Sequence, residues 1–62
     1  MLVKIGSEKK KVKYSGDARG LLRLLGVQKE TVIVAKNGKI VPESENVSEK
    51  DEIELIKVIF GG

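Results

Sequence analysis

Apolar residues recur at every second position in the first part of the chain. The alternation covers residues 1–5 and resumes with Val12 and Tyr14 between lysines, after the turn residues Gly6-Ser7. A period of two is the pattern of a strand with one buried face, and the turn residues join two such strands. The first part of the chain is therefore predicted to be a β-hairpin.

The spacing of apolar residues then changes to that of a helix. One stripe at helical spacing is formed by Ala18, Leu21, Leu22 and Leu25. Ser15 and Asp17 are both candidates for the N-cap of this helix, because either side chain can accept from its first free backbone amides. Gly26 is placed to end the helix as the C′ residue. Gly20 lies inside it, where glycine costs about 1 kcal/mol relative to alanine. Either packing compensates for this cost, or the backbone comes close to a neighbour there.

The second half of the chain contains three predicted strands. Residues 31–35 form a β-branched run without polar alternation, so both faces of this strand are expected to be covered or partly covered. Asn37-Gly38 predicts a type I′ hairpin turn into a short strand over residues 39–41, which Pro42 ends or confines to a sheet edge. A polar connection then leads to a last predicted strand over residues 52–59.

The order of these elements predicts an α+β fold. The predicted order is strand, strand, helix, strand, short strand and strand. The most economical arrangement of these elements is a mixed sheet of four to five strands with one helix packed on one face. The last strand can then pair with the first in the centre of the sheet, which is a β-grasp arrangement. Residues 1–60 are expected to form this domain, and residues 61–62 a flexible diglycine tail.

The composition argues against chemistry carried by side chains. The 62 residues include neither Cys nor His. The chain therefore lacks the usual zinc ligands, the Ser-His and Cys-His pairs, and the side chain that most often acts as a general base near neutral pH. No catalytic side chain and no metal ligand is assigned, and the chain is expected not to be an enzyme.

The chain is moderately basic and poor in aromatic residues. Its net charge is +3, and its aromatic residues are Tyr14 and Phe60. Nucleic-acid binding is poorly supported, because base stacking needs aromatic side chains and specific readout favours clustered arginine. The lysine-rich run over residues 9–13 is interpreted as a solvated strand face or hairpin edge, with an electrostatic contact to an acidic partner as the alternative. Apolar runs are far shorter than the roughly 20 residues that span a bilayer. No membrane association and a cytoplasmic location are therefore expected.

The sequence ends in two glycines, Gly61 and Gly62. A tail without Cβ atoms can enter a narrow channel and leave its carboxylate open to close approach. A free carboxylate is a poor acyl donor, so it requires activation. Adenylylation by ATP would make a mixed anhydride, from which a persulfide or thiol displaces AMP to leave a thiocarboxylate or thioester. ATP, metal and nucleophile would belong to the activating partner, and the chain itself is expected to bind no cofactor.

The last predicted strand is apolar on both faces. Ile53 and Leu55 share one face, and the other is formed by Ile56, Val58 and Phe60. If one helix covers only one face of the sheet, the second group projects from the open face or beyond the sheet edge and forms a docking surface for a partner. The alternative is that Phe60 folds back over the sheet and Ile56 is simply half-buried.

Two segments resemble the ThiS/MoaD group of sulfur carriers and their ubiquitin-like archaeal relatives. They are residues 31–42 and residues 51–62, and the resemblance covers essentially the full chain. The Ile40-Val41-Pro42 step and the short length are more similar to the thiamine-type carrier or the short archaeal modifier than to the molybdopterin-type carrier. Lys50-Asp51 departs from the Gly-Asp that family members often have.

The resemblance implies a sulfur carrier with a ubiquitin-like β-grasp fold. Gly62 would be adenylylated and converted into the thiocarboxylate, Gly61 would thread into the activating enzyme, and Ile56, Val58 and Phe60 would lie near its docking face. The implied partners are a ubiquitin-activating-like adenylyltransferase, which uses ATP and magnesium, and a sulfur-accepting enzyme of thiamine thiazole, molybdopterin or thiolated-tRNA synthesis.

Two other functions remain open on the sequence. A ubiquitin-like modifier would join Gly62 to lysines of target proteins through isopeptide bonds, and similar archaeal proteins can serve both roles. A non-covalent binding module would use the lysine-rich hairpin on RNA or on another acidic partner.

Overall fold

The computed structural model describes residues 1–28 and 31–58. Within these residues the elements are β1 (Leu2–Ile5), β2 (Glu8–Lys11), β3 (Gly16–Asp17), α1 (Ala18–Leu25), β4 (Val32–Lys36), β5 (Lys39–Val41), β6 (Asn46–Val47) and β7 (Glu52–Lys57). None of the helical structure in this part of the chain has the length and apolarity that a bilayer crossing requires.

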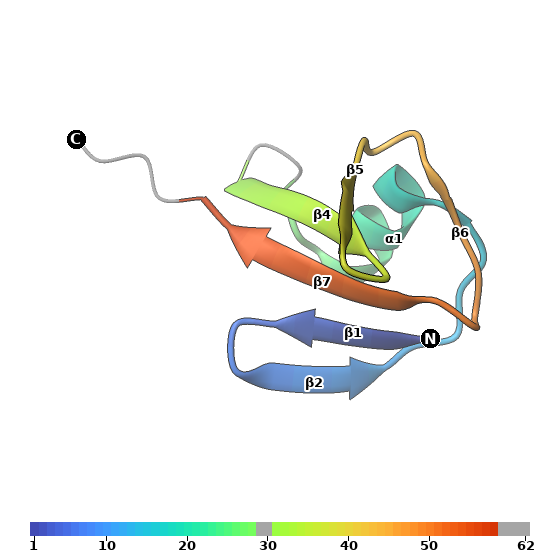
Figure 1. Ribbon diagram of the computed structural model, residues 1–62, viewed down its shortest axis with the longest axis horizontal. Coiled ribbons are helices and arrows are strands. Elements are labelled where there is room, and N and C mark those ends of the chain that lie inside the picture. Colours follow the sequence, from blue (N-terminus) through green and yellow to red (C-terminus); the bar gives the residue numbers. More distant parts are fainter. Residues whose placement is uncertain (29–30, 59–62) are drawn as a thin grey trace.

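The main sheet is mixed and has β7 at its centre. Over the described residues its strand order is β2-β1-β7-β4-β5, with β1 parallel to β7 and the other neighbours antiparallel (Figure 1). The α+β β-grasp fold is therefore confirmed, including the predicted pairing of the last strand with the first. Because β1 and β7 run in the same direction, Leu2 lies beside Glu52 at one end of the sheet and Ile5 beside Leu55 further along.

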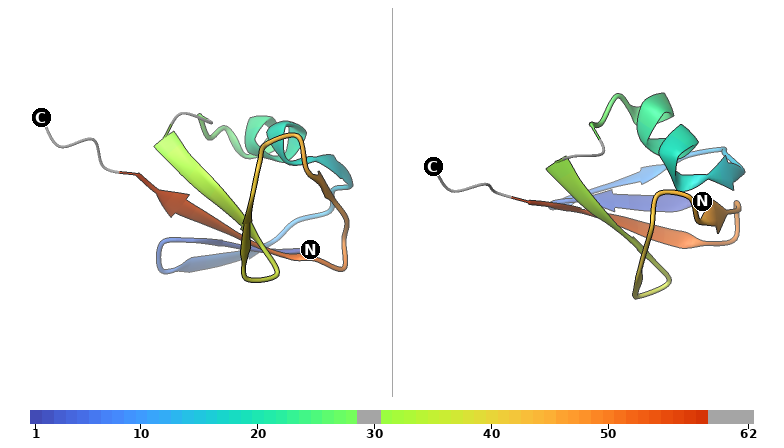
Figure 2. Two further views of the ribbon diagram at one scale, coloured as in Figure 1. Left: turned by 45° about the horizontal axis from the view of Figure 1, so that its top comes forward. Right: turned by 90° about the horizontal axis from the view of Figure 1, so that it is seen from above.

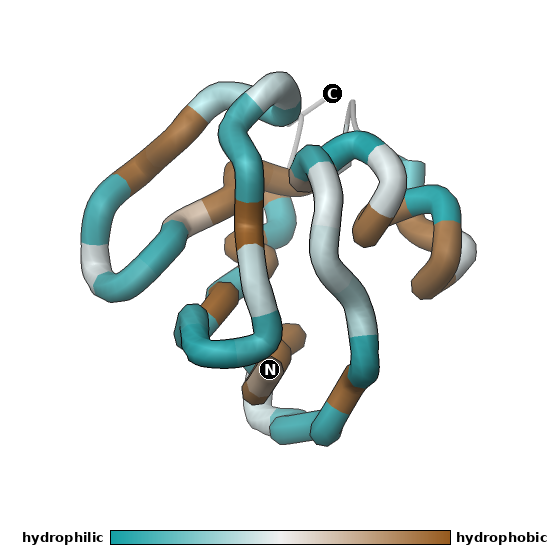
Figure 3. The backbone as a smooth tube through the Cα atoms, turned by 90° about the vertical axis from the view of Figure 1, so that its right-hand side faces the viewer, coloured by the Kyte–Doolittle hydropathy of each residue, from teal (hydrophilic) through white to brown (hydrophobic). Residues whose placement is uncertain are grey.

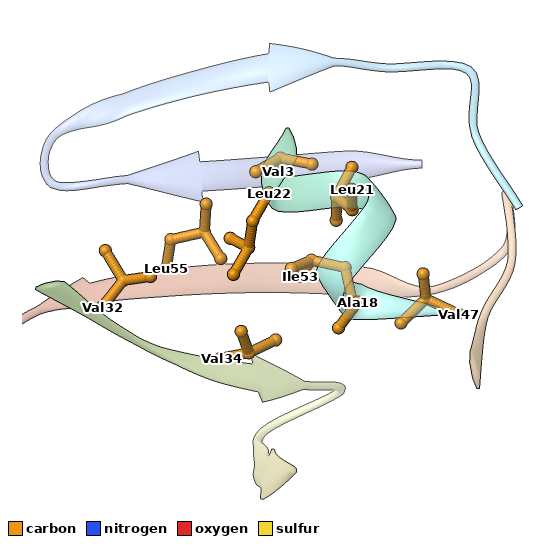
Figure 4. Close-up of a cluster of buried hydrophobic side chains, with 9 residues drawn as sticks. All are labelled: Val3, Ala18, Leu21, Leu22, Val32, Val34, Val47, Ile53 and Leu55. Atoms are coloured by element: carbon orange, nitrogen blue, oxygen red, sulfur yellow. The ribbon is translucent and has the colours of Figure 1, made fainter. Parts of the chain in front are cut away.

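Helix α1 crosses one face of this sheet (Figure 2). The predicted apolar stripe faces inward: Ala18, Leu21 and Leu22 are buried, and Leu25 packs against them from the edge. Beneath the helix lie side chains from β1, β4 and β7, joined by one from β6 (Figure 4). The residues of this core are Val3, Ala18, Leu21, Leu22, Val32, Val34, Val47, Ile53 and Leu55. Hydropathy along the backbone changes repeatedly between polar and apolar, because separate segments each contribute a few residues to one core (Figure 3).

Both ends of α1 are capped, so backbone groups that the helix leaves unpaired find hydrogen-bond partners. Of the two predicted N-cap candidates, Asp17 is the cap: its Oδ1 accepts from the backbone N–H of Gly20 at 2.8 Å. The backbone N–H of Ala18 donates to the carbonyl of Glu45 at 2.8 Å, so the connection before β6 also satisfies this helix end. Gly26 ends the helix in the left-handed conformation (φ 72°), as its position predicts.

The second strand differs from the sequence-based prediction. β2 comprises Glu8–Lys11 rather than a segment centred on Val12 and Tyr14. All four residues of β2 are exposed, so neither of its faces carries the apolar alternation from which a strand is recognised. Pairing with β1 nevertheless extends to Val12, whose backbone N–H donates to the carbonyl of Met1 at 2.9 Å.

A small second sheet was not predicted. It pairs β3 with β6, antiparallel, with Gly16 opposite Val47 and Asp17 opposite Asn46. This pairing holds the connection that follows β5 against the start of α1. The prediction that both faces of the strand over residues 31–35 are covered or partly covered is confirmed: Val32 and Val34 are buried on one face, and on the other Ala35 is buried and Ile33 is 38% exposed.

Candidate functional site

The two-sided pattern predicted for the last strand is found in β7. Ile53 and Leu55 are buried beneath α1, with 2% and 1% of their surface exposed. Ile56 has the opposite orientation along the strand and is 39% exposed. The central strand of the sheet therefore stabilises the core with one face and presents an isoleucine to solvent with the other.

Ile56 is part of a larger apolar area on the face of the sheet opposite α1. It lies directly opposite Ile33 of β4, and the two side chains are exposed to nearly the same extent, 39% and 38%. Ile40 of β5 is 71% exposed and lies opposite Ala35, next along β4 on the same face. We refer to Ile33, Ile40 and Ile56 as the open-face patch.

Ile56 was predicted from the sequence as a docking residue, whereas Ile33 and Ile40 were not. Ile33 belongs to an apolar run without alternation, so its face cannot be read from the run alone. The two-residue turn at Asn37-Gly38 sets the register that places Lys36 opposite Lys39 and Ala35 opposite Ile40. Counting back from that turn would have placed Ile40 on the same face as Ile33 and Ala35.

The remaining predicted site residues lie at or beyond the end of β7. Val58 is half-buried, and its backbone N–H donates to the carbonyl of Thr31 at 2.9 Å, so strand pairing continues one residue past Lys57. Phe60, Gly61 and Gly62 lie outside the described residues.

The other half of the open face is charged. Lys4 of β1 lies beside Glu54 of β7, and Lys9 of β2 lies opposite Lys4. Glu54 also lies opposite Ala35 of β4, which places this carboxylate at the border with the open-face patch. An apolar area on β4, β5 and the end of β7 thus adjoins a charged area on β1 and β2.

A hydrogen-bonded network joins the two loops at the start of β7. Asn37 donates from Nδ2 to Asp51 Oδ1 at 2.9 Å and accepts at Oδ1 from the backbone N–H of Glu52 at 2.9 Å. Asp51 Oδ2 also accepts from the backbone N–H of Ser48 at 2.8 Å. The bond from Asn37, followed by that from Ser48, holds the pKa of Asp51 below its ordinary value of 3.8. This network fixes the hairpin turn of β4 and β5 against the central strand.

The sheet has this strand order, and α1 crosses one of its faces. These two features define the class of ubiquitin-like β-grasp proteins. Comparison with known proteins places the chain within that class. The model of the ThiS family matches residues 3–62. A solved structure, described as the thiamine biosynthesis protein ThiS from Geobacter metallireducens, is similar over 100% of both chains, with 26% sequence identity and a TM-score of 0.69.

The chain belongs to the ThiS family. This assignment confirms the resemblance found in the sequence and gives the protein class as a small sulfur carrier rather than an enzyme.

Proposed function

We propose that this chain carries sulfur as a thiocarboxylate on Gly62. The observation that carries the proposal is the extent of the family match, which runs through the final Gly61-Gly62. The absence of Cys and His from the sequence supports a mechanism in which the chain supplies only the carboxylate and its partners supply the nucleophiles.

The proposed chemistry begins with activation of the Gly62 carboxylate. An adenylyltransferase of the ubiquitin-activating type transfers AMP from ATP to a carboxylate oxygen with release of pyrophosphate, and magnesium on the partner neutralises the phosphates. A persulfide on a partner protein then attacks the carbonyl carbon and displaces AMP, which forms an acyl disulfide. A second thiol cleaves the sulfur–sulfur bond, becomes part of a disulfide, and leaves the thiocarboxylate on Gly62.

We propose that the sulfur is delivered to the enzyme that forms the thiazole of thiamine. The chain would act in the cytoplasm, where ATP is available. The support for this acceptor is the description of the similar Geobacter metallireducens structure as a thiamine biosynthesis protein. Molybdopterin and tRNA thiolation are the alternatives for the same thiocarboxylate, and reconstitution with each sulfur-accepting enzyme would separate the three.

The docking surface for the activating enzyme is proposed to be the open-face patch together with Val58 and Phe60. The patch adjoins the end of β7, so a partner that covers Ile56 is also placed at the residues that lead to Gly61 and Gly62. Exposed apolar groups gathered on one face are typical of protein interaction sites. Gly61 would then enter the narrow approach to the catalytic centre of the partner, because it has no side chain to obstruct that approach.

Intact-mass analysis tests the sulfur-carrier proposal. The chain is incubated with the activating enzyme, ATP, magnesium and a persulfide donor, and the expected product is heavier by the difference between sulfur and oxygen. Samples without ATP, and a variant that ends at Gly61, are the controls and are expected to stay at the mass of the free acid. Recovery of the free acid alone from the complete reaction would contradict the proposal.

A protein-modifier function is tested on the same tail. Conjugation would leave residues 58–62 attached to a target lysine after trypsin cleavage at Lys57, because no Lys or Arg follows that residue in the sequence. Detection of this remnant would establish conjugation. Its absence, under conditions in which the thiocarboxylate accumulates, would restrict the tail to sulfur delivery.

A further inference from the structure

β2 has a free edge of unusual composition. The strand is at the end of the sheet order and, in the described part of the chain, pairs with β1 alone. Its sequence is Glu8-Lys9-Lys10-Lys11, and every residue is exposed. We propose that this edge is a second binding site, which takes an extended acidic segment of a partner protein as an added strand.

The hydrogen bonds of the β1–β2 ladder show which backbone groups of β2 are available. Met1 and Val12 exchange both bonds: the Val12 N–H donates to Met1 O at 2.9 Å, and the Met1 amine donates to Val12 O at 2.7 Å. In an antiparallel ladder, bonded and non-bonded pairs alternate. Lys10, opposite Val3, therefore directs its backbone groups toward β1, whereas Lys9 and Lys11 direct theirs to the free edge.

The same two lysines share one face of the sheet. Lys11 lies opposite Leu2 and Lys9 opposite Lys4, and these β1 residues lie beside Glu52 and Glu54 on the face away from α1. Lys10 has the other orientation. A strand added to the edge would thus bond to Lys9 and Lys11 and place its own side chains opposite them, about 5 Å away between Cβ atoms.

Charge selects the kind of strand that this edge accepts. Among the described residues, none of the three β2 lysines takes part in an ion pair. Lysines on an edge oppose pairing with another copy of the same edge, because like charges meet directly across the ladder. A segment with acidic residues at every second position reverses the sign of that interaction. The lysines therefore disfavour self-association and favour an acidic partner.

A hollow at the end of β2 offers a place for an apolar side chain. Its volume is about 530 Å³, and it lies where Lys11 and Val12 meet the start of β1 and the residues before β7. The apolar part of its lining is Met1, Leu2 and Val12. Its charged part is balanced, with Lys11, Lys13 and Lys50 against Glu49, Asp51 and Glu52, so the preference for acidic residues comes from the exposed lysines of β2 and the hollow supplies only the apolar contact. The expected ligand is a segment that runs parallel to β2 and in which alternating acidic residues precede an apolar one, because this direction brings the apolar residue to the Lys11 end of the strand. This hollow is lined by residues at the start of β1 and just before β7, whereas Lys57 is the last residue of β7, so the edge site lies at the opposite end of the central strand from Lys57.

The test uses the full chain, without ATP or an activating enzyme, so its result does not depend on the proposed sulfur chemistry. The probe is a short synthetic peptide in which glutamate alternates with valine and threonine, followed by a leucine. Titration calorimetry is expected to show binding that weakens by about fivefold to tenfold in each of Lys9→Glu and Lys11→Glu.

Lys10→Glu is the matched control, because it changes the net charge equally on the opposite face and is expected to change affinity by less than about twofold. Thermal unfolding of each variant checks that the fold is kept. Equal losses in all three variants would overturn the proposal, since they would indicate attraction by overall charge alone.

The backbone bonds are tested with the wild-type chain, so that no protein variant can fail to fold. A peptide of the same sequence, N-methylated at the amides expected to donate to Lys9 and Lys11, should lose most of its affinity. A peptide of the same composition with its glutamates grouped at one end should bind at least about fivefold more weakly. Unchanged affinity in either peptide would overturn strand addition. It would also be overturned if RNA bound tightly, displaced the acidic peptide and lost affinity for the Lys10→Glu variant.

Discussion

The hydroxyl group of Tyr14 occupies the position that a Cβ atom on Gly20 would need. This hydroxyl also donates to the backbone carbonyl of Asp17 at 2.8 Å, which fixes the ring across the first turn of α1. The glycine inside the helix therefore has a packing reason: a neighbouring side chain approaches the helix backbone more closely than any other residue at position 20 would permit.

Replacing Gly20 with alanine is expected to destabilise the domain. The gain in helix propensity, about 1 kcal/mol, is opposed by overlap of the new methyl group with the Tyr14 hydroxyl, and overpacking of this kind costs about 1–3 kcal/mol. We expect a net loss of up to about 2 kcal/mol in urea unfolding. In the Tyr14→Phe background, which lacks the hydroxyl, the loss should be smaller. Equal losses in both backgrounds would contradict the assigned contact.

Asp17→Ala is expected to weaken the start of α1. The substitution removes the carboxylate that accepts from the Gly20 N–H, and loss of an N-cap costs about 0.5–2 kcal/mol. Asp17→Ser, which keeps a capping oxygen, should retain most of the stability. Chemical unfolding of both variants measures the difference, and similar midpoints for Ala and Ser would contradict the capping role.

Stability is expected to fall in acid through protonation of Asp51. Its pKa is lowered in the folded chain, chiefly by the hydrogen bond from Asn37. A carboxyl group with a lowered folded pKa contributes stability that is complete above the unfolded pKa and is lost as pH falls through the folded pKa. Asp51→Asn should therefore lower the melting temperature most above pH 3.8, with a difference from wild type that shrinks at lower pH.

Ser48→Ala serves as a control for the acid titration. This variant loses the Oγ contact to Asp51 at 3.3 Å but keeps the shorter bond from its backbone N–H. It should retain most of the acid-dependent loss of stability. A pH profile for Asp51→Asn that runs parallel to wild type through the acid range would show that this carboxylate is not the titrating group.

Ile56→Asp is expected to reduce formation of the thiocarboxylate without unfolding the chain. The side chain is 39% exposed in the open-face patch, and truncating a central interface residue weakens binding by about tenfold or more. Leu24→Asp is the matched control, because Leu24 is a 58% exposed apolar residue on α1, away from the patch. Equal rates for the two variants in the intact-mass assay would contradict docking through the open face.

The sequence was most informative where local rules and tertiary structure agree. The stripe of Leu21 and Leu22, the αL glycine at Gly26 and the turn at Asn37-Gly38 each have a local physical cause, and all were predicted correctly. The pairing of the last strand with the first was predicted from the element order, and the structure adds that β1 and β7 run parallel.

What the sequence did not predict depends on contacts between distant segments. β2 carries exposed charged residues and becomes a strand because β1 offers a partner ladder, not because of its own pattern. The β3–β6 pairing joins two-residue segments that are far apart in the sequence, so it depends on how the chain between β5 and β7 folds back on the start of α1. In the site, Ile56 was found from alternation along one strand, whereas Ile33 and Ile40 required the register between strands.

The central position of β7 also has a mechanical consequence. Its backbone is bonded to β1 on one side and β4 on the other, and these bonds run across the strand direction. A pull along the chain beyond Lys57 therefore loads the two ladders together in shear, rather than opening their bonds one after another. A partner that draws in the end of the chain would therefore be pulling on a strand that is paired on both sides, and the fold would resist that pull.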